Sequence, residues 1–63
     1  MVDYSKALRQ ARAIKELKQE VLADAAGISS NYVSMIEQGK RKPSVDVLEG
    51  LAKALSVSVW VFV

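Results

Sequence analysis

Gly27 separates two short amphipathic segments in the middle of the chain, and this arrangement restricts the fold more than any other feature. Residues 19–26 place apolar side chains at helical spacing, and glycine accepts the left-handed conformation in which helices end. Ser29, two residues after the glycine, offers a hydroxyl that can cap the next helix. A helix that ends in AAGIS (residues 25–29) and restarts at once predicts two helices joined by a tight turn.

The flanking segments predict further short helices. Helical spacing starts at Tyr4 and continues, past a bend, to Leu17. Gly39 ends the helix that follows the tight turn, and Pro43-Ser44 then provides an extended residue and a cap for the next helix. The residues expected to face inward are Leu8, Ala11, Leu17, Leu22, Ala23, Ala26, Val33, Ile36, Val45, Leu48, Leu51, Ala52 and Leu55.

The tail VSVWVFV (residues 57–63) fits either a short fifth helix capped by Ser58 or an extended segment. No internal repeat, low-complexity segment or strand alternation precedes it. We therefore predict an all-α fold, a compact bundle of four to five short helices that forms a single domain over residues 1–63.

Length and composition argue against an enzyme. A chain of 63 residues hides only about 60% of its unfolded surface on folding, so a deep pocket that excludes water is not expected. The sequence has no Cys and no His, which removes disulfides, thiolate or imidazole metal sites and the usual general base. No pair of carboxylates or activated nucleophile suggests an active site. We expect no catalysis, no cofactor and no metal.

The sequence also predicts a cytoplasmic location. No apolar run approaches the roughly 20 residues that span a bilayer, so we expect no membrane association. Asp3 stands near the start of the chain, where a secretory signal has a basic leader and then an apolar stretch, so we expect no secretory signal.

The positive charge is weak in sum but concentrated in one place. Nine Lys or Arg residues stand against seven Asp or Glu, and Lys40, Arg41 and Lys42 are contiguous. Such a run is most often a solvated loop. The simplest interpretation of residues 28–44 is therefore a capped surface helix followed by solvated charges.

Two stretches favour a more specific interpretation. LKQEVLADAAGISSNYVSMIEQGKRKPS (residues 17–44) and LAKALSVSV (residues 51–59) resemble the phage repressor/Cro (XRE) family of helix-turn-helix DNA-binding domains. The resemblance runs from about Tyr4 to Val63 and implies five short helices, the third of which enters the DNA major groove. It further implies a transcriptional regulator that binds a double-stranded DNA operator. We expect repression, and activation stays open as the alternative. Because helix-turn-helix dimers read half-sites about 34 Å apart, we expect a homodimer on DNA.

The resemblance assigns base contacts to the third helix. Ser30, Asn31 and Ser34 are expected on its outward face. Asparagine suits a bidentate contact with adenine, and serine can bond several base edges. For Tyr32, beside them, two interpretations stay open: it touches a thymine methyl or a phosphate, or it covers the bundle.

Phosphate contacts are expected at the helix starts and in the basic loop. Gln19 opens the second helix, where the backbone N–H and the helix dipole favour a phosphate, and in the family a glutamine at this place contacts DNA. Ser29 and Lys40 match further phosphate-binding positions. Arg41 and Lys42 are expected to act as supporting charges that release counterions.

Arg12 and Glu37 match positions that form an ion pair in the family. The pair would orient the third helix and keep the carboxylate from repelling phosphate. An exposed pair of this kind contributes only about 0–1 kcal/mol to stability. The sequence departs from the family at Glu16 and Lys18, where glycine and a capping Thr or Ser are usual, so the first two helices could be joined by a kink rather than a clean break.

Apolar residues also stand where the family more often has polar ones, namely Ile14, Val21, Val47, Trp60 and Val61. Trp60, Val61 and Phe62 cluster at the end of the chain and are the candidate dimer contact. Alternatively, Trp60 folds back onto its own bundle. Two other interpretations of the chain remain open. One is a protein-interaction module, such as an antitoxin or a multimerising adaptor, that uses this tail. The other is a redesigned or minimised version of the fold.

Overall fold

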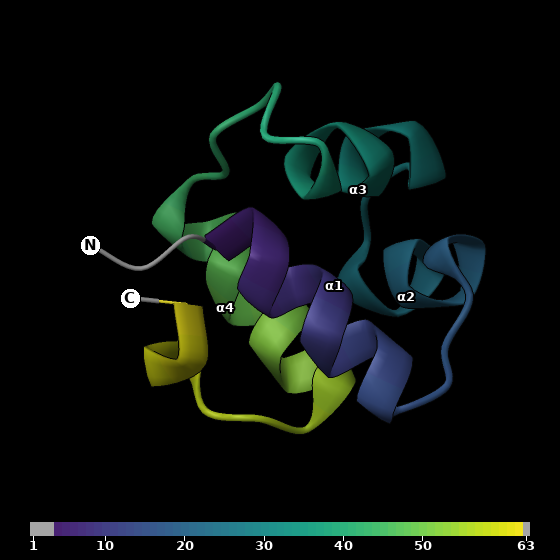
Figure 1. Cartoon of the computed structure of the whole chain (residues 1–63), viewed down its shortest axis with the longest axis vertical. Coiled ribbons are helices and arrows are strands. Elements are labelled where there is room, and N and C mark those ends of the chain that lie inside the picture. The colour runs from purple at the N-terminus through teal and green to yellow at the C-terminus, as the bar shows by residue number, and fades with distance from the viewer. Residues whose placement is uncertain (1–3, 63) are drawn as a thin grey trace.

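The computed structural model describes residues 4–62, and within that range the chain forms helices and no strand (Figure 1). The elements are α1 (Tyr4–Ile14), α2 (Gln19–Ala26), α3 (Ser30–Glu37), α4 (Val45–Leu55) and a 3-10 helix, η1 (Val59–Phe62). The predicted all-α bundle of four to five short helices is confirmed. Asp3, on which the expectation of no leader rested, lies outside the described residues.

One core joins all the elements. α2 contacts both α3 and α4, α1 contacts α3 and η1, and α4 contacts η1. The buried apolar side chains are Leu8, Ala11, Leu22, Ala23, Val33, Ile36, Leu51, Ala52, Leu55 and Phe62. Leu17, Ala26 and Leu48 are partly buried and pack against this core. No helix within residues 4–62 has the length and apolar character needed to cross a membrane.

The prediction that Val45 faces inward is wrong. Its side chain is 67% exposed. Val45 is the first residue of α4, and Leu48, almost one turn later, is only partly buried. The packed stripe of α4 therefore begins inside the helix rather than at its first residue.

The predicted helix ends are confirmed around α3. The Ser29 hydroxyl accepts a hydrogen bond of 3.0 Å from the Tyr32 N–H, and the Ser44 hydroxyl accepts one of 3.3 Å from the Val47 N–H. Gly27 closes α2 in the left-handed conformation, with φ at 73°. The turn between α2 and α3 is thus fixed by a glycine on one side and a serine cap on the other.

α1 and α2 are separated by a break rather than a kink. α1 ends at Ile14, and Glu16 adopts a left-handed φ of 55° although it is not glycine. Lys18 occupies the N-cap position of α2, where no side chain accepts a capping hydrogen bond. Glu16, which stands where the family usually has glycine, is therefore strained. Lys18, which stands where the family usually has a capping Thr or Ser, leaves the start of α2 without a side-chain cap.

The tail forms the short helix rather than the extended segment. The Ser58 hydroxyl accepts a hydrogen bond of 3.3 Å from the Trp60 N–H. With three residues per turn, Val59 and Phe62 share one face of η1. Phe62 is 2% exposed and belongs to the core, so its assignment to a dimer contact is wrong.

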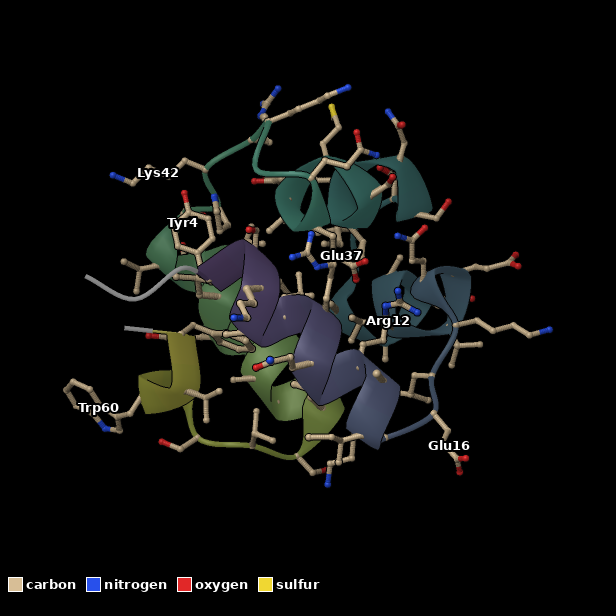
Figure 2. All side chains as sticks on the ribbon, viewed as in Figure 1. Tyr4, Arg12, Glu16, Glu37, Lys42 and Trp60 are labelled. Atoms are coloured by element: carbon tan, nitrogen blue, oxygen red, sulfur yellow. The ribbon has the colours of Figure 1, made fainter. Side chains whose placement is uncertain are left out.

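Trp60 and Val61 lie on the other face of η1 and are 77% and 44% exposed. The alternative in which Trp60 folds back onto its own bundle is therefore also wrong. Figure 2 shows the indole pointing away from the molecule. η1 lies at the lower left of Figure 1, on the side of the molecule away from α3.

Candidate nucleic-acid interface

α3 lies at the edge of the bundle, with one face packed and the other open (Figure 1). Val33 and Ile36 are fully buried. Ser30 and Asn31 are exposed, whereas Ser34 is half-buried. Since the packed face is anchored by large side chains of the core, the polar face is held on a rigid support.

Ser34 is engaged by a residue that the sequence analysis missed. The Gln38 Nε2 donates a 2.8 Å hydrogen bond to the Ser34 hydroxyl oxygen. The two residues are four apart, a spacing at which side chains meet on a helix, and this was the available signal. Because the serine oxygen accepts this bond, its own hydrogen is left to donate to another acceptor.

Glu37, at the last position of α3, is surrounded by donors from other elements. Arg12 makes a bidentate contact, with Nε 2.7 Å from Oε2 and Nη2 3.0 Å from Oε1. Gln19 Nε2 donates a further bond of 3.0 Å to Oε1. The structure thus brings together the proposed pair Arg12–Glu37 and adds Gln19, which the sequence analysis had treated only as a phosphate contact.

The Arg12–Glu37 pair is mostly hidden from water rather than exposed. The side chains are 24% and 5% exposed, respectively. Hydrogen bonding to Glu37 is the main cause that raises the pKa of Arg12 above its ordinary value, and burial opposes it. In Figure 2, Glu37 lies beneath α3 and Arg12 lies between α1 and α2. This pair joins the third helix to the first.

Two further bonds tighten the same junction. Arg12 Nη1 donates to the Leu17 carbonyl at 2.8 Å, which fixes the loop that leads into α2. Arg9 Nη1 donates to the Glu37 carbonyl at 2.9 Å. The sequence pattern gave no signal for the Arg9 bond, because it joins residues 28 positions apart.

A polar recess lies where the starts of α2 and α3 approach each other. Its volume is about 530 Å³, and it is lined by Arg12, Lys18, Gln19, Glu20 and Ser30. Gln19, expected at a phosphate, and Ser30, expected at a base, therefore border one recess. The structure places these two candidates together, as a surface that binds both backbone and bases requires.

The basic loop adjoins the same helix. Lys40, Arg41 and Lys42 are all exposed, and Lys42 points away from the bundle in Figure 2. The Arg41 guanidinium carbon lies 5.6 Å from the centroid of the Tyr32 ring. Tyr32 is half-buried and packs against the core, as one of its two sequence interpretations predicted.

Comparison with known proteins decides the family. Residues 8–59 match the protein family described as Helix-turn-helix. The chain belongs to the helix-turn-helix family. The resemblance drawn from residues 17–44 and 51–59 is therefore confirmed, and the tight turn at Gly27 is the turn of this helix-turn-helix domain.

Relatives of this helix-turn-helix domain carry names of regulators. The uncharacterized HTH-type transcriptional regulator Rv0474 of Mycobacterium tuberculosis is 45% identical over 51 residues, which cover 81% of this chain and 36% of Rv0474. The HTH-type transcriptional regulator PrtR of Pseudomonas aeruginosa is 43% identical over 58 residues, which cover 90% of this chain and 22% of PrtR. The chain thus spans about a third of Rv0474 and less than a quarter of PrtR.

One solved structure matches this chain over almost the full length of both chains. The restriction-modification controller protein C.AhdI from Aeromonas hydrophila superposes with a TM-score of 0.93 at 34% sequence identity. The match covers 98% of this chain and 94% of C.AhdI. The fold of this helix-turn-helix domain is therefore also the fold of most of the C.AhdI chain.

Proposed function

We propose that the chain binds double-stranded DNA in a sequence-specific manner and regulates transcription, with α3 in the major groove. The observation that carries the proposal is the outward face of α3, where exposed Ser30 and Asn31 stand on a helix anchored by fully buried residues. A major groove admits an α-helix, and its base edges are read by short polar side chains of this kind. Relatives named as transcriptional regulators support the same function.

The contacts divide into reading and anchoring. Asn31 reads adenine through its amide, and Ser30 and Ser34 bond neighbouring base edges. The bond from Gln38 makes the Ser34 hydroxyl a donor, which favours acceptor edges such as guanine O6 and N7 or thymine O4. Tyr32 contacts a thymine methyl or a phosphate beside them.

Anchoring falls to the groups that surround the reading helix. Gln19 and Ser29 contact phosphates at the starts of α2 and α3, and Lys40 does so from the basic loop, with Arg41 and Lys42 in support. The side-chain amide of Gln19 donates a hydrogen bond to the Glu37 carboxylate, so this anchor is fixed before DNA arrives. The salt bridge to Arg12 keeps the Glu37 charge from opposing phosphate.

The proposal includes assembly and mode of action. Two chains bind a palindromic operator, since one short helix makes few base contacts and paired half-sites lie about 34 Å apart. Trp60 and Val61 are the proposed dimer contacts, because they are exposed apolar groups at the side away from α3. We assign repression by occlusion of the operator, in the cytoplasm, without catalysis, cofactor or metal.

Selection of bound duplexes from a random pool, at two salt concentrations, tests the proposal. A consensus sequence recovered at both salt concentrations is the expected result, and its symmetry reports the assembly. The same selection with Asn31→Ala serves as the matched control, and the consensus should lose information at particular positions. Enrichment of no sequence by the wild-type chain at either salt concentration would overturn the proposal in favour of a protein-interaction module.

A further inference from the structure

The contact between Arg41 and Tyr32 separates Arg41 from the other cations of its loop. Its guanidinium lies over the tyrosine ring, 5.6 Å from the ring centroid. A cation within about 6 Å of an aromatic centroid is attracted by the negative face of the ring. Arginine favours this arrangement because its planar group can also stack on the ring.

Tyr32 is therefore confined from two sides. It packs against the core and is half-buried, and Arg41 covers part of what remains. Its backbone N–H is held as well, because it donates to the Ser29 hydroxyl at 3.0 Å. A ring confined in this way loses little freedom when a ligand contacts its exposed edge.

We propose that Arg41 is a positioning residue for Tyr32, holding the ring in one orientation beside Asn31 on the outward face of α3. The inference rests on the proposed function and refines it. From the sequence, Arg41 and Lys42 were expected to be equivalent supporting charges. The geometry gives Arg41 a second role, in which it influences which sequence is bound and not only how tightly any duplex is bound.

Substitution by lysine separates the two roles. Arg41→Lys keeps the charge and removes the planar group, so the dependence of affinity on salt should stay unchanged. Discrimination between the operator and its single-base variants should fall at the position beside Asn31. The fall should be at most about two- to five-fold, the size of a whole exposed cation–π contact, because the lysine ammonium keeps part of the attraction to the ring. Lys42→Ala, the matched control, should weaken all duplexes alike and lower the log–log salt slope, by less than the roughly one unit expected of Lys40→Ala.

A double-mutant cycle tests the coupling directly. If Arg41 acts through Tyr32, Arg41→Lys should cause no further loss of discrimination in a Tyr32→Leu background. Tyr32→Phe keeps the ring, so the effect of Arg41→Lys should persist in that background. Thermal unfolding of each variant shows whether a loss reflects folding, and Tyr32→Met, which also removes the ring, replaces Tyr32→Leu in the cycle if Tyr32→Leu does not fold.

The free protein provides a readout that does not involve DNA. Protons on the Arg41 side chain should show upfield NMR shifts from the tyrosine ring, retained in Tyr32→Phe and lost in Tyr32→Leu. Identical Arg41 shifts in wild type and Tyr32→Leu would overturn the contact. Independent effects of the two substitutions on discrimination, with a wild type that does discriminate, would overturn the positioning role alone. A wild type without sequence preference would remove the proposed function and the positioning role together.

Discussion

Glu37 shows at the scale of a single residue how this small domain holds α3 in place. Its carboxylate is almost completely buried, and such a charge is tolerated only with partners. Arg12 supplies two bonds from α1, and Gln19 supplies one from α2. One residue at the end of α3 therefore links three helices.

Removing the arginine should leave this charge unpaired. Arg12→Met is expected to lower the free energy of unfolding by about 3 kcal/mol, the lower end of the range for breaking a buried pair, because Arg12 keeps some exposure. The double variant Arg12→Met/Glu37→Leu should recover most of the loss, since apolar replacement of both partners is often neutral. Urea unfolding of both variants measures this. A loss below about 1 kcal/mol in the single variant would show that the pair behaves as an exposed one.

At this scale, the sequence predicted the facing or the bonding partner of some side chains and not of others. The facing of Ser30 and Asn31 followed from helical spacing, and the Arg12–Glu37 pair followed from the family resemblance. The bond from Arg9 to the Glu37 carbonyl and the ring contact of Arg41 could not be predicted, because they depend on how distant segments meet. The Gln38–Ser34 bond was within reach of the sequence, since its spacing is local.

At the scale of the elements, helix ends with local signals were predictable. Ser29, Ser44 and Gly27 each act through their own side chain or backbone, and all three do as predicted. The errors at Val45 and Phe62 concern burial near the ends of α4 and η1. Burial there is decided by which neighbours reach the residue, and neither helical spacing nor hydrophobicity contains that information.

The strained junction between α1 and α2 yields a stability prediction. Glu16 holds a left-handed φ of 55°, a conformation that costs non-glycine residues about 1–2 kcal/mol. Glu16→Gly should therefore raise the free energy of unfolding by about 0.5–1 kcal/mol, after the greater freedom of glycine in the unfolded chain is subtracted. Glu16→Ala, which keeps the strain, is the control for loss of the charge. Equal stability of the two variants in urea unfolding would contradict the strain.

At the scale of the whole molecule, the bundle presents two different exposed surfaces. The polar face of α3 and the basic loop form one of them. The other includes Ile14 at the end of α1 and Val61 on η1, which are 78% and 44% exposed and line one apolar recess. The proposed function uses the first surface for DNA and the tail residues Trp60 and Val61 for a second copy of the chain.

Trp60 and Phe62, two tail residues with opposite burial, test the dimer. Trp60→Ala should weaken two-chain assembly on a palindromic duplex and leave thermal unfolding nearly unchanged, because the indole is exposed. Phe62→Ala should instead destabilise the fold by about 3–5 kcal/mol, because its ring lies in the core. Sedimentation of the wild type at saturation should show two chains per duplex. A complex of one chain per duplex would contradict the dimer.

The most direct test of the central claim compares binding by the wild type, Asn31→Ala and Lys40→Ala across a salt series, using the selected operator, its single-base variants and a random duplex. If α3 reads bases, Asn31→Ala should lose about 1–3 kcal/mol of discrimination at particular positions. If the loop grips phosphate, Lys40→Ala should weaken every duplex by a similar factor and lower the log–log salt slope by about one unit. An unchanged specificity ratio in Asn31→Ala, together with an unchanged salt slope in Lys40→Ala, would contradict the account and leave α3 a capped surface helix.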